Sequence, residues 1–162
     1  MIEVEITEEM KQRAWRKARE MGKLKNSITK GEGNISGFIG EEVANSLIEG
    51  VVTNTYDYDI TSGDQQLITW DVKTKRCTSP PRDYYDCSVA AFNTKQNCDR
   101  YVFVRVMFTK NRWGPAWVLG WYDKNKYFKD ARFLKKGQID PDNNFKVKAD
   151  CYNISIKDLK KL

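Results

Sequence analysis

Between residues 56 and 75 the chain alternates apolar and polar side chains on either side of a short turn. In the second of these segments Ile68, Trp70 and Val72 alternate with polar residues. This period of two is typical of a β-strand with one buried face. Aromatic and β-branched residues flank a glycine-containing turn at residues 61–64. The pattern therefore predicts a β-hairpin whose charged residues project from the face opposite its apolar residues.

The rest of the chain predicts helices before this hairpin and mainly strands after it. Thr7 is placed as the N-cap of a first helix that ends at Gly22, and Gly50 ends a second helix over residues 38–49. A polar, glycine-rich loop is expected at residues 23–37. The elements predicted after the hairpin are a strand at 85–91, a helix at 93–99, strands at 101–108 and 116–122, a short helix after 123, a loop at 137–144, and a strand or turn at 152–156.

These elements indicate one α/β domain with a mixed central β-sheet flanked by helices. The length of 162 residues fits a single domain. We divide it into N-terminal helices with a basic loop at 1–50, a sheet core at 51–122 and a C-terminal extension at 123–162. No apolar run approaches the roughly twenty residues of a membrane-spanning helix, and the N-terminus lacks the pattern of a secretory signal. A cytoplasmic protein without a membrane partner is therefore expected.

Histidine is absent from the sequence. This excludes mechanisms that depend on histidine, including serine and cysteine triads, HNH nucleases and metalloproteases with paired histidines. The four cysteines form no CxxC pair, so reduced structural thiols are expected. A zinc site built from distant cysteines stays open as the alternative. Chemistry in this chain therefore has to use carboxylates and lysines, with or without a metal ion.

A surplus of basic residues near the N-terminus points to a polyanionic partner. The net charge is +6, and the stretch from Lys11 to Lys30 contains eight Lys or Arg residues and one acidic residue. Such a stripe attracts nucleic acid, although a solvated helix face has the same composition. We place the basic residues of the first helix on its outer surface. The candidate phosphate contacts in this region are Arg13, Arg16, Lys17, Lys23, Lys25, Asn26 and Lys30.

Two aspartates converge on the predicted hairpin. Asp71 and Lys73 project from one face of the second strand, and strand pairing brings Asp59 close to Asp71. Two carboxylates without a basic partner repel each other and commonly bind a hard cation such as Mg²⁺. We expect Asp59, Asp71 and the carbonyl of Val72 to bind this metal, and Lys73 to position a water nucleophile. The alternative is a solvated strand face with a simple charge pair.

The order of these motifs resembles the PD-(D/E)XK nuclease superfamily. An acidic residue on a helix is followed by Tyr58-Asp59, where the family typically has proline before aspartate, then by a turn and by Asp71-Val72-Lys73 on the paired strand. The resemblance implies a restriction-endonuclease-like fold. It also implies Mg²⁺-dependent cleavage of double-stranded DNA, with Mn²⁺ able to substitute.

The same resemblance assigns further residues. It implies that Glu41, near the first turn of the second helix, helps to hold the metal, with Glu42 as the alternative. It also implies that Lys95 and Gln96 face the site. Other stretches, at residues 25–34, 87–106 and 120–121, are similar to small bacteriophage proteins with this nuclease core. They imply a phage origin and the cytoplasm of a bacterial host as the location.

Basic and aromatic residues continue beyond the Asp-x-Lys motif. Lys75 and Arg76 follow it directly, and Tyr84 lies in a proline-containing loop that begins at Pro80. Lysine and arginine position phosphates, and tyrosine stacks on bases or wedges between them. We therefore add Lys75, Arg76 and Tyr84 to the candidate DNA contacts.

Site-specific cleavage of duplex DNA, of the homing or restriction kind, is the leading hypothesis. A resolvase of four-way junctions uses the same chemistry, and the residues do not decide between the two. A non-catalytic module that binds DNA or RNA is a further alternative. The intact set of Asp59, Asp71, Lys73 and Glu41 argues against it.

Cleavage of two strands of opposite polarity requires two active sites, and one chain of this length carries one set of site residues. A homodimer or a higher homo-oligomer is therefore expected. Four aromatic residues of the second half are candidates either for the interface or for the core: Trp113, Trp117, Trp121 and Tyr127.

Overall fold

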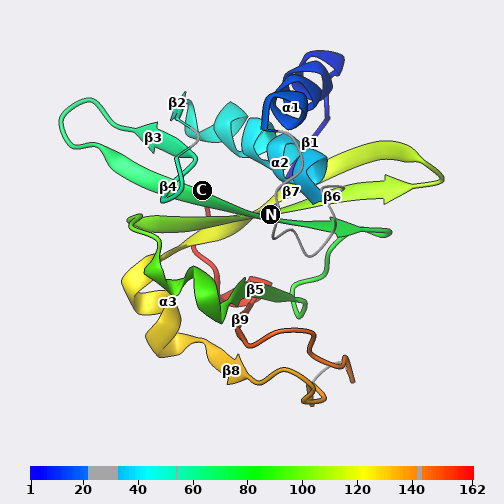
Figure 1. Cartoon of the computed structure of the whole chain (residues 1–162), viewed down its shortest axis with the longest axis vertical. Coiled ribbons are helices and arrows are strands. Elements are labelled where there is room, and N and C mark those ends of the chain that lie inside the picture. The colour runs from blue at the N-terminus through cyan, green and yellow to red at the C-terminus, as the bar shows by residue number, and fades with distance from the viewer. Residues whose placement is uncertain (22–32, 54, 142–143) are drawn as a thin grey trace.

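The computed structural model describes residues 1–21, 33–53, 55–141 and 144–162. The fold is mixed α/β and has three layers (Figure 1). Helices α1 (Glu8–Met21) and α2 (Gly33–Ile48) form the first layer. A six-stranded sheet forms the second, and a three-stranded sheet with helix α3 (Lys124–Asp130) forms the third. Helix α2 packs on the large sheet, and α1 packs mainly on α2.

The large sheet contains the predicted hairpin. Its strands are β1 (Ile2–Val4), β2 (Val51–Val52), β3 (Ile60–Ser62), β4 (Ile68–Cys77), β6 (Arg100–Thr109) and β7 (Arg112–Asp123), in the order β1-β7-β6-β4-β3-β2. Strands β3 and β4 pair antiparallel, with Ile60 opposite Trp70. Strands β4 and β6 are parallel, whereas the remaining pairs are antiparallel. Strand β4 is therefore hydrogen-bonded on both edges, and the hairpin prediction is confirmed.

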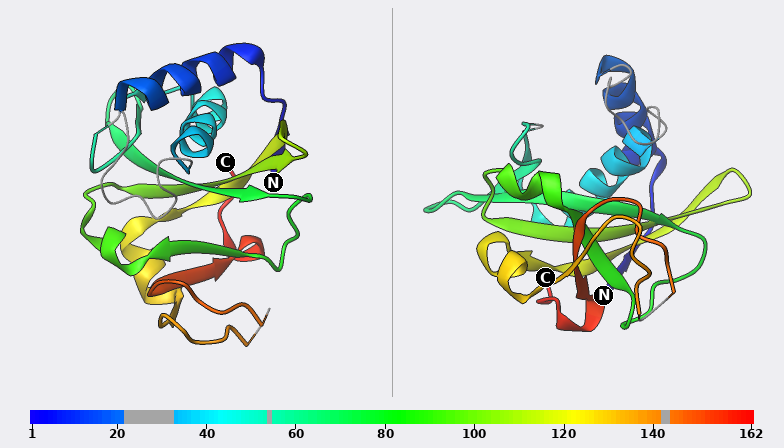
Figure 2. Two further views of the ribbon diagram at one scale, coloured as in Figure 1. Left: turned by 45° about the vertical axis from the view of Figure 1, so that its right-hand side comes forward. Right: turned by 60° about the horizontal axis from the view of Figure 1, so that its bottom comes forward.

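The small sheet lies on the face of the large sheet opposite the helices (Figure 2). Its strands are β5 (Asp86–Ala90), β9 (Cys151–Ser155) and β8 (Arg132–Leu134), paired in that order. Short 3-10 helices follow β5, at Ala91–Lys95, and β9, at Ile156–Asp158. The buried Tyr127 hydroxyl of α3 lies 2.8 Å from the carbonyl oxygens of both Cys87 and Tyr152. This tyrosine therefore ties α3 to both longer strands of the small sheet.

Strand β6 is apolar on both faces because a core lies on each side of it. Val102 and Val104 pack in the core beneath the helices, whereas Tyr101 and Phe103 pack in the core that faces α3 and the small sheet. A strand covered on both faces reads as a continuous apolar run rather than as an alternation. The long apolar stretch at 101–108 has this cause.

Helix α2 begins earlier than the sequence indicated. The predicted loop to Gly37 is wrong for residues 33–37, which form the start of α2. Packing of Ile35 and Phe38 into the core outweighs the low helix propensity of the glycines. Glu41 and Glu42 consequently lie in the middle of α2 and not in its first turn. Strands β1 and β8 were not predicted, and the helix expected at 93–99 is the short 3-10 turn at Ala91–Lys95.

Helix α1 follows the prediction at its start but not in the direction of all its charges. The Thr7 hydroxyl accepts a hydrogen bond of 3.2 Å from the Met10 N–H, which is an N-cap interaction. Lys17 was expected on the outer surface. It lies instead between the helices, because its ammonium contacts carboxylates of α2. The helix stop predicted at Gly22 lies outside the described residues.

The aromatic residues considered for a dimer interface belong largely to the protomer's own cores. Trp117 and Tyr127 are buried, and Trp113 and Trp121 are half-buried. Trp121 packs edge-on against Trp70, with ring centroids 5.8 Å apart. Trp117 and Tyr127 therefore fill the core, which is one of the two roles predicted for these aromatic residues. No helix within the described part of the chain is long and apolar enough to cross a membrane.

A close approach of α2 to β4 depends on Gly40. A Cβ atom at this position would overlap the side chain of Thr74 on β4, including the Thr74 Oγ1 and Cβ atoms. The absence of a side chain lets the helix backbone lie directly on the strand. The glycine thus sets the distance between Glu41, the next residue, and the motif on β4.

We expect Gly40→Ala to lower the free energy of unfolding by about 1–3 kcal/mol, because the added methyl group forces the helix off the strand. The matched control is Gly37→Ala in the same helix, where an added Cβ meets nothing within 4 Å. It should leave stability unchanged or raise it by about 0.5–1 kcal/mol. Chemical denaturation of both variants measures the difference. Equal stabilities would contradict the close helix–strand contact.

Candidate active site

Asp59 is fixed where strand β3 begins. It lies one residue before Ile60, and its own N–H donates to the Trp70 carbonyl at 2.8 Å. Its Oδ2 atom accepts a hydrogen bond of 2.7 Å from the Val72 N–H. N–H and C=O of one strand residue face the same edge, so the Val72 carbonyl also faces the Asp59 side. A carboxylate and a backbone carbonyl are thereby held together.

Asp71 and Lys73 project from the same face of β4. Asp71 is only 4% exposed, and its Oδ2 atom forms an ion pair with the Lys73 ammonium. The same ammonium donates to Gln96 Oε1 at 2.9 Å and lies 5.3 Å from the centre of the Tyr101 ring. Among the described residues, Asp71 Oδ2 accepts no hydrogen bond of regular geometry. This oxygen therefore retains capacity for another ligand.

Gln96 connects three segments at this site. Its Nε2 atom lies 3.4 Å from Asp71 Oδ1 and donates to the Tyr56 carbonyl at 3.1 Å. The next residue extends the connection, because the Asn97 N–H donates to the Asp57 carboxylate at 3.0 Å. The turn after the first 3-10 helix is thus hydrogen-bonded to the segment that carries Asp59.

Helix α2 contributes two buried glutamates that have different partners. The Glu42 carboxylate lies 2.6 Å from Arg13 Nε, and Lys17 Nζ lies 3.4 Å from both Glu41 and Glu42. Glu41 is the one whose charge acts on both Asp59 and Asp71. Of the two, Glu41 is therefore the helix residue associated with the aspartates, and Glu42 mainly joins the helices.

Burial and neighbouring charges disfavour the ionisation of two acidic groups at this site, Asp59 and Glu41. Burial, together with the charges of Glu41 and Asp71, raises the pKa of Asp59 to about 8, and the Val72 hydrogen bond acts in the opposite direction. Burial also raises the pKa of Glu41 to about 7, against the lowering effect of Lys17. In the metal-free protein near neutral pH, these carboxyl groups therefore tend to hold protons. A bound cation would displace those protons.

The residues fit a magnesium ion better than a softer metal. In the described ranges, no three His, Cys, Asp or Glu side chains group closely enough to form a ready metal cage. Mg²⁺ needs fewer protein ligands, because it retains several waters and uses one or two carboxylates together with substrate phosphates. Asp59, Asp71 and the Val72 carbonyl offer such a set. Burial raises the pKa of the nearby Cys98 thiol to about 12, so this cysteine stays protonated.

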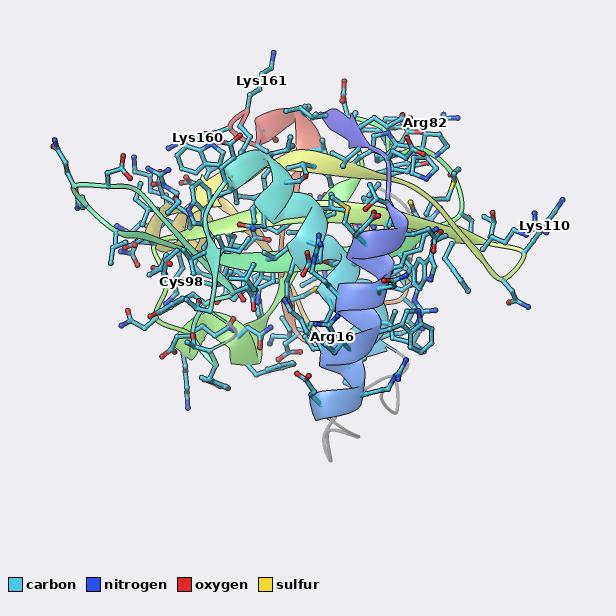
Figure 3. The ribbon with its side chains drawn as sticks, turned by 90° about the horizontal axis from the view of Figure 1, so that it is seen from above. Arg16, Arg82, Cys98, Lys110, Lys160 and Lys161 are labelled. Carbon is cyan, nitrogen blue, oxygen red and sulfur yellow. The ribbon has the colours of Figure 1, made fainter. Side chains whose placement is uncertain are left out.

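The other residues that were predicted to contact DNA or to face the site are dispersed. Lys95 is exposed and away from the hydrogen bonds of the site, whereas Gln96 is part of them. Exposed candidates include Arg16 on α1 (Figure 3), and Lys75 and Arg76 on the second half of β4. Tyr84 is 63% exposed and accepts a hydrogen bond of 3.0 Å from Arg82. The candidates that fall outside the described residues are Lys23, Lys25, Asn26 and Lys30.

Sequence reasoning missed three neighbours of the site. Tyr101 lies opposite Asp71 in the parallel register, and the Lys124 ammonium donates to the Gln96 carbonyl. Lys17 was assigned to DNA and is instead the counter-charge of Glu41. On a helical wheel, Lys17 lies seven residues after Met10 and three after Ala14, both buried, and this spacing would have indicated an inward position. No local signal reveals the β4–β6 register.

No known family profile matches the chain, and no curated protein sequence has significant similarity to it. We therefore infer function from the geometry of the site.

We expect the metal-free protein to lose stability as pH rises. Because the pKa values of Asp59 and Glu41 are raised on folding, the folded state binds more protons than the unfolded state between about pH 4 and pH 8. The free energy of unfolding that these bound protons contribute is present at low pH and is lost as the pH rises from about 4 to about 8. Asp59→Asn keeps the acceptor for Val72 and should raise the melting temperature at pH 8 by roughly 5 °C.

Thermal melts in chelator from pH 5 to pH 8.5 measure this effect, with the exposed Asp64→Asn as the matched control. Magnesium should stabilise the wild type at pH 8 more than it stabilises Asp59→Asn. Parallel pH profiles for wild type and Asp59→Asn would contradict the electrostatic description of the site.

Proposed function

We propose that this protein is a Mg²⁺-dependent endonuclease that hydrolyses phosphodiester bonds in double-stranded DNA. The observation that carries the proposal is the placement of the Asp59 carboxylate on Val72, between Asp71 and Lys73, with the Lys73 ammonium paired to Asp71. A structural charge pair needs one acid and one base. It does not account for two further carboxyl groups, the half-buried Asp59 and the buried Glu41, whose pKa values are raised. A metal-assisted reaction at a phosphate accounts for them.

The resemblance to the PD-(D/E)XK superfamily supports the same conclusion. A helix, a hairpin with one aspartate before β3, and Asp-x-Lys on β4 occur in the order that the superfamily has. The mixed sheet with helices on one face is compatible with a restriction-endonuclease-like fold, which we include in the proposal. The location in a bacterial host and the homing or restriction role belong to this proposal as well.

Each side chain has a separate task in the proposed reaction. Asp59 and Asp71, with the Val72 carbonyl, would hold the cation, which supplies a water of lowered pKa and shields the phosphate charge. Lys73 orients the attacking oxygen and stabilises the negative charge that develops on the phosphoryl oxygens. Gln96 acts as a positioning residue because it holds both the Lys73 ammonium and the Asp71 carboxylate.

We expect Lys73→Ala to lower the rate of DNA cleavage by roughly a hundredfold or more while affecting DNA affinity much less, because Lys73 acts on the transition state. Lys129→Ala, at an exposed lysine of α3, is the matched control and should cleave at the wild-type rate. Supercoiled plasmid, linear phage DNA and a four-way junction are compared with Mg²⁺, with Mn²⁺ and with excess chelator.

Cleavage only with a divalent metal, and its loss in Lys73→Ala and Asp71→Asn, would support the proposal. Preferential cleavage of the four-way junction would show that the enzyme is a resolvase and not a site-specific endonuclease. Undiminished cleavage in excess chelator, or by the Lys73→Ala variant, would overturn the proposed chemistry. DNA binding without cleavage of any substrate would point to a non-catalytic module.

We also propose that the protein acts on duplex DNA as a homodimer, because each protomer carries a single set of site residues. Sedimentation with a specific duplex should give a complex of two chains. A plasmid time course should give linear product. A stable monomer that produces only nicked circles would contradict the dimer.

A further inference from the structure

A second cleft lies between the two sheets, on the face of β4 away from α2. Its volume is about 740 Å³, within the range of pockets that hold small organic ligands. The large sheet contributes Lys75 and Arg105, and the small sheet contributes Ser88 and Asn153. The mouth is aromatic, because Tyr84 and Phe145 line the cleft and remain 63% and 52% exposed.

The floor of this cleft carries two neighbouring positive charges. The parallel register places Lys75 opposite Arg105, which is only 6% exposed. The Arg105 guanidinium donates to the Asp86 carbonyl at 2.6 Å. In the described part of the chain, neither cation forms an ion pair with a carboxylate. Two acidic side chains that line the cleft, Asp86 and Asp140, are paired with Arg132 at 3.2 and 3.0 Å.

Such a pair of cations is unfavourable without an anion. Lys75 is exposed at its surface, but desolvation by the surrounding protein atoms, followed by the charge of Arg105, lowers its pKa. A buried guanidinium without a counter-charge is costly. An anionic group bound between Lys75 and Arg105 would relieve both effects. A phosphate suits this place, because arginine and lysine are its usual protein partners.

The walls of the cleft suit a base beside that phosphate. Tyr84 and Tyr85 pack edge to face with centroids 5.0 Å apart, and both line the cleft together with Phe145. Aromatic side chains of this kind stack on unpaired bases. Asn153 and Ser88, whose polar atoms lie 2.5 Å apart, add hydrogen-bonding groups to the wall. Apolar faces, a few polar groups and two cations together match a nucleotide.

The cleft adjoins a second cavity that is lined by Lys73 of the candidate active site. A smaller cavity of about 270 Å³ is lined by Lys73 and shares Lys75, Ser88 and Arg105 with the cleft. A strand whose phosphate lies at Lys73 can therefore pass a neighbouring nucleotide toward the aromatic mouth.

We propose that this cleft binds one unpaired nucleotide of the DNA strand, with its phosphate on Lys75 and Arg105 and its base against Tyr84, Tyr85 and Phe145. The choice of a DNA strand as the source of the nucleotide rests on the proposed function. A base inside a duplex is stacked, and extruding it costs free energy. The protein therefore prefers DNA in which a nucleotide is already unpaired.

The experiment measures binding without cleavage, using the full-length Asp71→Asn variant in chelator. Fluorescence anisotropy compares three labelled duplexes: a perfect duplex, the same duplex with one extra unpaired nucleotide, and that duplex with an abasic residue at the unpaired position. The unpaired nucleotide should strengthen binding by about tenfold, and removal of its base should abolish the gain. Free deoxynucleoside monophosphate, tested as a competitor, distinguishes a site for soluble nucleotides from a site for the strand.

Variants then locate the effect. Adding Phe145→Ala should remove the preference for the unpaired nucleotide. Lys75→Gln should weaken DNA binding and lower the slope of log affinity against log salt concentration by the amount expected for about one phosphate contact. Phe133→Ala, at a partly exposed phenylalanine outside the cleft, is the matched control and should keep the preference. A photoreactive 5-iodouracil at the unpaired position should crosslink to Tyr84, Tyr85 or Phe145.

Equal affinity for the perfect and unpaired duplexes, or a preference that survives Phe145→Ala, would overturn the cleft proposal. Tight binding of the free monophosphate, with no gain from the strand, would also overturn it. Metal-dependent cleavage by the wild type, without a preference for the unpaired nucleotide, would support the nuclease proposal and overturn the cleft proposal. A base-dependent preference without metal-dependent cleavage would support the cleft and overturn the nuclease.

Discussion

The hydrogen bond from the Val72 N–H to the Asp59 carboxylate is the constraint on which the site depends. Strand β3 begins at Ile60, so beyond it β4 needs a different acceptor at its edge. The Asp59 side chain supplies that acceptor and continues the ladder of β4. In doing so it is held in a dry position beside Asp71. The hydrogen bond that completes the edge of the sheet thereby holds the Asp59 and Asp71 carboxyl groups near each other.

The fold compensates this charge with lysines from separate elements. Lys73, from β4 itself, pairs with Asp71, and Lys17, from α1, contacts Glu41. The compensation is incomplete, since the pKa values of Asp59 and Glu41 remain raised. The proposed divalent cation would compensate the charge that the lysines leave. Gly40 allows the arrangement, because it brings α2 into contact with β4.

The face of β4 that carries the motif continues into the second cleft. Asp71, Lys73 and Lys75 are spaced by two residues, so they follow one another along this face. Acidic groups gather at the β3 end, and Lys75 lies beside Arg105 in the second cleft. A polyanionic strand with a metal ion at one phosphate would meet complementary charge along this direction.

The sequence alone determined the hairpin, the alternation that places Asp71 and Lys73 on the face opposite Trp70 and Val72, and the mixed α/β class, because these depend on a local period of two residues. It also predicted that Asp59 lies close to the Asp71-Val72-Lys73 segment, as its hydrogen bond with Val72 confirms. Only the tertiary structure decided the early start of α2, the inward position of Lys17 and the parallel register that joins Lys75 to Arg105. These features depend on packing and pairing between residues far apart in the chain, which local propensity does not encode.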